Sequence, residues 1–205
     1  MKTDNTNKFA LSLLTAAILS APSAFAADPA HGKSITDALA DSKAKLSFRA
    51  RYEGVGQDGK DDANGLTVRS RFTVNTGAYQ NFSLGLEVDN ISALVDDYND
   101  LGVNYVGNEA VIADAEVTDV NQAFIKYTNG DLSIKGGRQR INHDAQRFIG
   151  GVGWRQNEQT YDGYRFQYDA TDKLNLDYTY VYNVNRIFGP ESKVAGQLDG
   201  SLHLF

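Results

Sequence analysis

Apolar and polar side chains alternate along this chain in stretches of about ten residues, and the connections between the stretches run long, short, long, short. Alternation with a period of two is typical of a β-strand whose two faces meet different media. Lipid offers no hydrogen-bond partners, so a sheet that spans a membrane must close on itself with apolar side chains outside. The pattern predicts an all-β fold, an antiparallel transmembrane β-barrel of the bacterial outer membrane.

The alternation is clearest in residues 45–52 and 66–74, where an apolar face opposes a face with two arginines. Five further strands are expected at 82–89, 120–127, 132–140, 164–168 and 174–183. Phe124 breaks the alternation of one of them. Gly136-Gly137 predicts a β-bulge in another, which would change the residues that face inward.

The connections differ in length in a regular way. The long ones are residues 53–65, 90–118, 141–160 and 184–200, and the short ones are 76–81, 128–131 and 169–173. Outer-membrane barrels have short periplasmic turns and long extracellular loops. Residues 27–44 are therefore expected on the periplasmic side.

The N-terminus resembles an export signal. Two lysines precede an apolar run that ends at Ala24-Phe25-Ala26, a small-x-small pattern where signal peptidase cuts. The run is too short and too interrupted for a membrane-spanning helix. We expect a signal peptide over residues 1–26, a periplasmic segment over 27–42 and the barrel domain over 43–205.

The chain ends before an eighth strand has room to cross a membrane. That strand would begin near Ser201, whereas a spanning strand needs about nine to eleven residues. We expect seven to eight strands of a larger barrel of roughly 16 to 18 strands. The chain then corresponds to an N-terminal half or a truncated product. Whether it closes into a pore by itself is not decided by the sequence.

Composition excludes several classes of function. Cysteine is absent, which excludes disulfides and thiolate metal sites, and the formal net charge of −6 argues against a nucleic-acid partner. The three histidines, His31, His143 and His203, are scattered, and His143 beside Asp144 has no serine nearby in the sequence. We expect no enzymatic activity, no metal and no cofactor.

The distinctive motifs lie in the second half of the chain. Gly137-Arg138-Gln139-Arg140-Ile141-Asn142 is followed by Gln146-Arg147-Phe148-Ile149-Gly150, Gly153-Trp154-Arg155-Gln156-Asn157 and Tyr161-Asp162-Gly163. With the strands at 47–53 and 84–89, this series resembles the alginate-export-like outer-membrane porins over residues 43–188. The resemblance implies a single-chain barrel of many strands with an arginine-rich lumen that passes anionic sugars or other small solutes.

The arginines are the candidate functional residues. A turn near Gly59 would place Arg49 opposite Arg69, and like charges across a ladder are destabilising unless they meet water, acids or an anion. Guanidinium groups bind carboxylates and phosphates bidentately. The candidate pore-lining residues are Arg49, Arg51, Arg69, Arg71, Arg138, Arg140, Arg147, Arg155 and Arg165. In the alternative interpretation, lumenal arginines pair with Glu87, Asp89 and Asp177 and stiffen the wall.

The long loops are acidic, which indicates a solvated surface or cation bridging to lipopolysaccharide. Loop 90–118 is long enough to fold into the lumen as a constriction. Expected partners are outer-membrane lipid, lipopolysaccharide, the barrel-assembly machinery and anionic or polar solutes. The sequence thus predicts an outer-membrane channel; the alternative is a barrel that binds glycans through aromatics such as Trp154 without transport.

Overall fold

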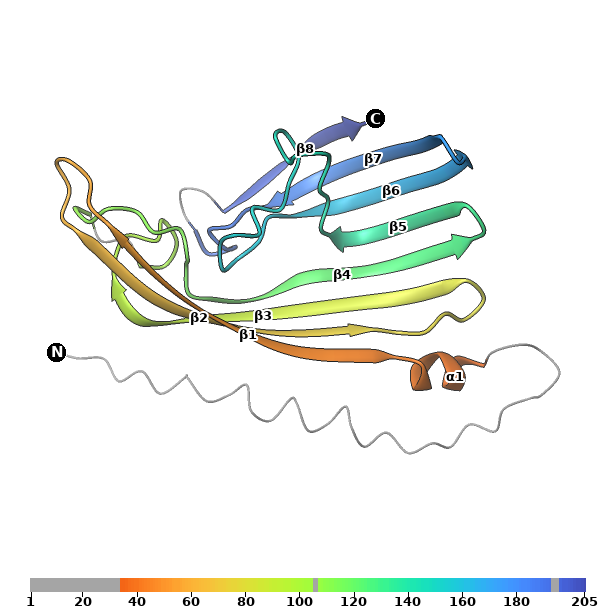
Figure 1. The fold of residues 1–205 in the computed structure, drawn as a ribbon, viewed down its shortest axis with the longest axis horizontal. Helices are drawn as coiled ribbons and strands as arrows, with labels where there is room; N and C mark the ends of the chain where they lie inside the picture. The colour runs from red at the N-terminus through yellow and green to blue at the C-terminus, as the bar shows by residue number, and fades with distance from the viewer. Residues whose placement is uncertain (1–33, 105–106, 193–195) are drawn as a thin grey trace.

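One curved antiparallel sheet dominates the structure, a computed structural model that describes residues 34–104, 107–192 and 196–205 (Figure 1). Each strand pairs with its neighbours in the chain, and β1 and β8 form the two edges. The elements are α1 (Ile35–Ala40), β1 (Lys43–Val55), β2 (Ala63–Asn75), β3 (Phe82–Asp97), β4 (Val117–Asn129), β5 (Leu132–Gln139), β6 (Thr160–Thr171), β7 (Leu174–Asn185) and β8 (Gln197–Leu204). The all-β, antiparallel prediction is confirmed. The predicted signal peptide, residues 1–26, lies outside the described residues.

Side-chain exposure follows the predicted alternation. Phe48 on β1 is 69% exposed, while the side chain of Arg51 on the opposite face is 13% exposed. The outward row continues with Leu46, Tyr52, Leu84, Ile125, Tyr164, Phe166 and Leu176. An exposed apolar row backed by a polar face is what a lipid-facing strand requires.

Phe124 belongs to the inner face despite its apolar side chain. It pairs with Gly85 on β3, and a Cβ atom on Gly85 would lie 2.2 Å from the Phe124 ring. The glycine therefore leaves room for the ring to lie against the wall of the sheet. This close approach explains why the alternation of β4 breaks at Phe124.

The bulge predicted at Gly136-Gly137 is wrong. The register of β5 runs without a shift against both β4 and β6. Gly137 instead adopts a φ of 117°, a conformation that L side chains rarely adopt. A register shift occurs in the neighbouring pair, between Glu87 and Val88, where Asn121 of β4 has no direct partner.

Two predicted connections are shorter than expected. β3 continues to Asp97, because Asn64 pairs with Asp97, so residues 90–97 are strand and not loop. β8 begins at Gln197, ahead of the predicted start at Ser201. The extension of β3 was missed because the alternation changes phase after Val88: Asn90 continues the apolar phase and Ile91 lies on the polar one. The start of β8 was missed because Leu198 is the only large apolar residue of 197–200.

The short turns lie together at one end of the sheet, beside α1, and the longer connections gather toward the other (Figure 1). α1 lies within residues 27–42, the segment expected on the periplasmic side, and the Gly77 N–H in the β2–β3 turn donates to the Ala38 carbonyl at 2.9 Å. In the described ranges, no helix has the length and hydropathy needed to cross a bilayer.

Candidate functional site

A segment of the β5–β6 connection lies across the inner face of β1 and β2. We call residues 153–158 the strap. The guanidinium of Arg49 donates to the carbonyl oxygens of Gly153 at 3.2 Å, Trp154 at 2.5 Å and Arg155 at 3.1 Å. The expected register is confirmed, because Arg49 pairs directly with Arg69. The guanidinium of Arg49 is therefore occupied by hydrogen bonds to backbone carbonyls of the strap.

Gln156 anchors the centre of the strap and is 0% exposed. Its side-chain amide donates to the Thr67 carbonyl at 3.1 Å, to the Thr67 hydroxyl at 3.0 Å and to the Arg49 carbonyl at 3.1 Å. The backbone carbonyl of Gln156 accepts from Arg69 at 3.0 Å, and its backbone N–H donates to the Asp114 carboxylate at 3.0 Å. A neutral amide thus fixes the strap to β1 and β2.

Asp114 comes from the loop predicted to fold inward. Most of that loop packs at the long-loop end of the sheet, where Tyr98 and Ile112 form a small buried cluster with Ala63 and Ala110. Its last turn brings Asp114 to within 3.4 Å of Arg51. The strap, however, comes from the connection between β5 and β6.

Glu158 ends the strap among arginines. Its carboxylate accepts from Arg71 at 3.0 Å and from Arg140 Nε at 2.5 Å, and it lies 3.8 Å from Arg69. Burial raises the pKa of Glu158, but the charges of Arg140 and Arg71 outweigh burial and lower that pKa below its ordinary value. Glu158 is therefore an ionised internal ligand of the arginine face.

Arg71 has further acidic partners on β3. Its guanidinium bonds both oxygens of Asp89, each at 2.6 Å, and lies 3.4 Å from Glu87. On β6 and β7, Arg165 forms an ion pair with Asp177. These are the acidic partners named by the wall-stiffening interpretation, so several lumenal arginines are already paired.

Trp154 of the strap is 57% exposed. Arg51 and Arg155 lie over its ring, with their guanidinium carbons 4.4 and 4.1 Å from the centroid. Both also bond the same oxygen of Glu53, at 2.6 and 2.8 Å. A single Glu53 oxygen cannot reach two guanidinium groups that lie on opposite faces of the indole ring. Arg51 and Arg155 therefore lie on the same face of the Trp154 ring.

Besides Arg165, two further predicted arginines lie outside the cluster around the strap. Arg138 pairs with Asp162 at 2.9 Å and with Asp119 at 3.5 Å. Arg147 is exposed and makes no ion pair within the described part of the chain. Neither contacts the strap through a hydrogen bond among the described residues.

A row of cations crosses β4, β5 and β6, and the sequence reasoning named only Arg165 of this row as a candidate site residue. Lys126 pairs with Lys135, and Lys135 pairs with Arg165. The Lys135 ammonium lies 4.5 Å from the ring centroid of Phe124. Over residues 34–104, 107–192 and 196–205, neither lysine has a carboxylate within ion-pair distance. Lys135 was missed because a bulge was expected at Gly136-Gly137 beside it.

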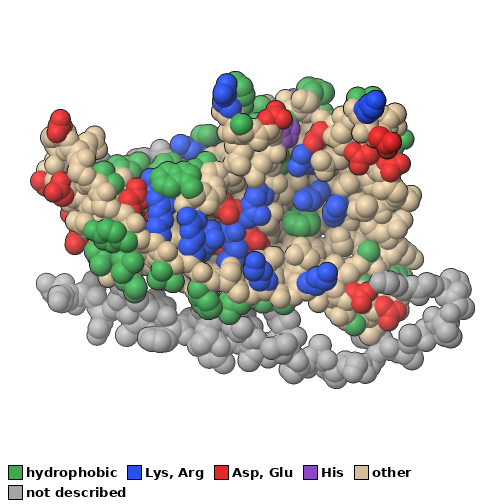
Figure 2. Space-filling view, viewed as in Figure 1, with side chains coloured by type: hydrophobic (Ala, Val, Ile, Leu, Met, Phe, Trp, Pro, Cys, Tyr) green, Lys and Arg blue, Asp and Glu red, His purple; other side chains and the backbone are tan. Residues whose placement is uncertain are grey.

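Basic side chains gather over the middle of the face seen in Figure 2, and acidic ones lie mainly toward its margins. An open hollow of about 230 Å³ lies on the inner face, lined by Thr73, Asn75, Leu86, Glu87, Gln122, Phe124 and Arg140. Because Lys135 rests over the ring of Phe124, the cation row borders this hollow.

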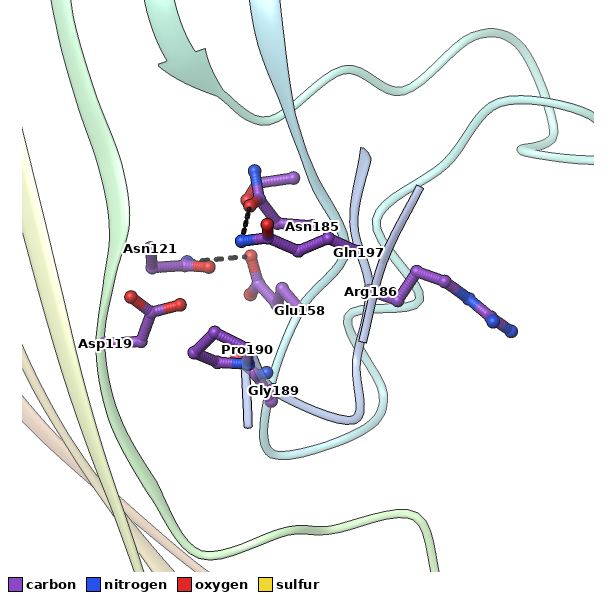
Figure 3. Close-up of a pocket in the computed structure, with 10 residues that line it drawn as sticks. Asp119, Asn121, Glu158, Asn185, Arg186, Gly189, Pro190 and Gln197 are labelled. Carbon is purple, nitrogen blue, oxygen red and sulfur yellow. Dashed lines mark hydrogen bonds between the residues drawn. The ribbon is translucent and has the colours of Figure 1, made fainter. Parts of the chain in front are cut away.

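A second pocket lies between β4 and the start of β8 (Figure 3). Asn121 donates to Glu158 at 3.4 Å, and Gln197 donates to Asn185 at 3.1 Å. Its volume of about 10 Å³ holds no more than a single water molecule. This pocket lies beside the end of the strap, at Asn157 and Glu158, and is too small for a solute.

Comparison with known proteins gives one match. The family model described as alginate export matches residues 41–185, which span β1 to β7. No curated protein and no solved structure matches the chain. The family consists of outer-membrane transport porins and not of enzymes. The matched residues make up most of the sequence, and the chain belongs to the alginate export family.

Proposed function

We propose that the protein forms the wall of an outer-membrane channel that passes anionic or polar solutes, with anionic saccharides such as alginate as the favoured class. The observation that carries the proposal is the row of Lys126, Lys135 and Arg165 on the inner face. Only Arg165 in this row has a carboxylate partner among the described residues. Two ammonium groups are therefore left to attract an anion.

The magnitude of that attraction suits transport. At 4 Å, two unit charges interact by about 1 kcal/mol in water and by about 4 kcal/mol at the effective dielectric constant near a protein surface. Conduction requires attraction strong enough for entry and weak enough for release. Two lysines without a carboxylate partner among the described residues meet this condition better than a buried, paired guanidinium does.

The arginines around the strap have a different proposed role. Their charges are nearly balanced by carboxylates, because Arg49, Arg51, Arg69, Arg71, Arg140 and Arg155 lie among Glu53, Glu87, Asp89, Asp114 and Glu158. We assign them to the shape of the lumen, since they hold the strap against the wall. We assign selectivity mainly to Lys126 and Lys135.

The exposed ring of Trp154 favours a second candidate, a barrel that binds a glycan without passing it. Aromatic rings with one free face are frequent anchors for ligands. Such a barrel needs no solute flux.

Swelling of liposomes that carry the protein separates the two functions. We expect glucuronate to enter faster than glucosamine, a cation of similar size. Lys126→Gln combined with Lys135→Gln should remove most of this preference, whereas Lys60→Gln with Lys173→Gln, at two exposed positions in turns, should retain it. Absence of flux for both solutes would instead support the binding barrel.

A further inference from the structure

Glu158 occupies a place that a carboxylate solute would also fit. We propose that Arg69, Arg71 and Arg140 form a carboxylate-binding site whose internal ligand is Glu158. A solute carboxylate competes with Glu158 and releases the strap from the wall. This inference rests on the proposed function and adds a displaceable constriction to it.

The site has the features of an anion site. Arg71 and Arg140 donate to Glu158 at 3.0 and 2.5 Å, and Arg69 lies 3.8 Å away. They come from separate parts of the sheet, since Arg69 and Arg71 lie on β2 and Arg140 follows β5. Guanidinium groups match carboxylates in geometry and charge, whichever molecule supplies the carboxylate.

The strap is held by polar contacts. Its carbonyls accept from Arg49, Arg51 and Arg69, and its buried amide residues are Gln156 and Asn157. The two apolar clusters of the described residues contain no member of 153–158. Polar contacts exchange readily with water and with a competing anion, so an ionic competitor can loosen the strap without opening an apolar core.

The backbone is strained at Val152, the residue directly before the strap. Val152 has a φ of 50°, and a positive φ is a genuine outlier for a β-branched residue. It lies between Gly151 and Gly153, which permit backbone rotation. Strained backbone persists where surrounding contacts enforce it. Loss of the Glu158 contacts therefore favours movement of the strap away from the wall.

The chain carries its own reporter of this movement, because Trp154 in the strap is its single tryptophan. While the strap is docked, Arg51 and Arg155 cover one side of the indole ring. Release of the strap exposes that side to solvent. Quenching of tryptophan fluorescence by acrylamide, an uncharged quencher, therefore measures strap position without any transport assay.

The experiment uses the whole chain in lipid, with sodium glucuronate replacing sodium chloride at constant ionic strength. We expect the quenching constant to rise about twofold with glucuronate and to stay constant with glucose. Glu158→Gln should show the raised value without glucuronate. Asp144→Asn, which alters an exposed carboxylate in the same connection, should behave like the parent protein. A quenching constant of the parent protein that does not change with glucuronate would overturn the inference. This outcome can be read even if the Glu158 variant fails to fold.

Liposome swelling on the same preparations separates this inference from the proposed function. Selective flux of glucuronate with constant quenching refutes the displaceable strap alone. Quenching that responds to glucuronate without any flux supports the site and refutes the channel.

Discussion

Arg71 shows how much a single side chain of the inner face contributes. Its guanidinium contacts Glu87, Asp89 and Glu158, and Asp89 is fully buried. Removal of one partner from a buried ion pair costs about 3 to 5 kcal/mol, because the other charge stays buried and unpaired.

We therefore expect Arg71→Met to lower the free energy of unfolding by about that amount. Arg147→Met, at an exposed position without an ion pair in the described chain, should change it by less than about 0.5 kcal/mol. Urea titration of the folded fraction in lipid, followed by heat-modifiable gel migration, measures both. Equal midpoints for the two variants would show that the Arg71 cluster is dispensable for stability.

At the scale of elements, the strap should respond to acid. The groups that face Glu158 are Arg69, Arg71, Arg140 and Glu87, and their net effect lowers the pKa of Glu158 below its ordinary value of 4.5. A lowered pKa in the folded state means that ionised Glu158 stabilises the docked strap above pH 4.5. That stabilisation is lost as the pH falls through the folded-state pKa.

We expect acrylamide quenching of Trp154 to be constant from pH 7 to about 5 and to rise below the ordinary carboxyl range. Glu158→Gln should show a smaller rise, since its docking no longer depends on this proton. Identical pH profiles for the parent protein and the variant would contradict the role of Glu158.

The two faces of β6 should differ in their tolerance of charge. Phe166 points outward beside Tyr178, whereas Gln167 points inward and donates to Asp177 at 3.1 Å. An arginine on the lipid face costs about 2 to 4 kcal/mol near the membrane midplane. Phe166→Arg should lower the urea midpoint strongly, and Gln167→Arg should not. A larger loss of stability in Gln167→Arg than in Phe166→Arg would show that lipid contacts the face of Gln167 and contradict this assignment.

The local pattern was sufficient to predict the strands but not the site. Alternation identified seven strands, their faces and the pairing of Arg49 with Arg69, because each depends on neighbouring residues and on the position of one turn near Gly59. The contact between Arg49 and Gly153 joins residues 104 positions apart, so no local pattern reports it. Lys135 was missed because a glycine pair was interpreted as a change of phase, whereas the register is continuous.

For the whole molecule, the important property is the uneven distribution of charge. The chain has a formal net charge of −6, yet its inner face carries a cation row and an arginine cluster. The acidic residues of the connections and turns lie toward the margins of that face (Figure 2). Selectivity should therefore follow the lumen charge and not the net charge.

The reversal potential of single channels in a planar bilayer under a salt gradient reports this selectivity. It should be recorded on the 205-residue chain and on any longer natural form. We expect an anion-selective potential that shrinks in the Lys126→Gln, Lys135→Gln variant and persists in the Lys60→Gln, Lys173→Gln control. A cation-selective potential, or the absence of channel steps from every form, would contradict an anion-passing channel.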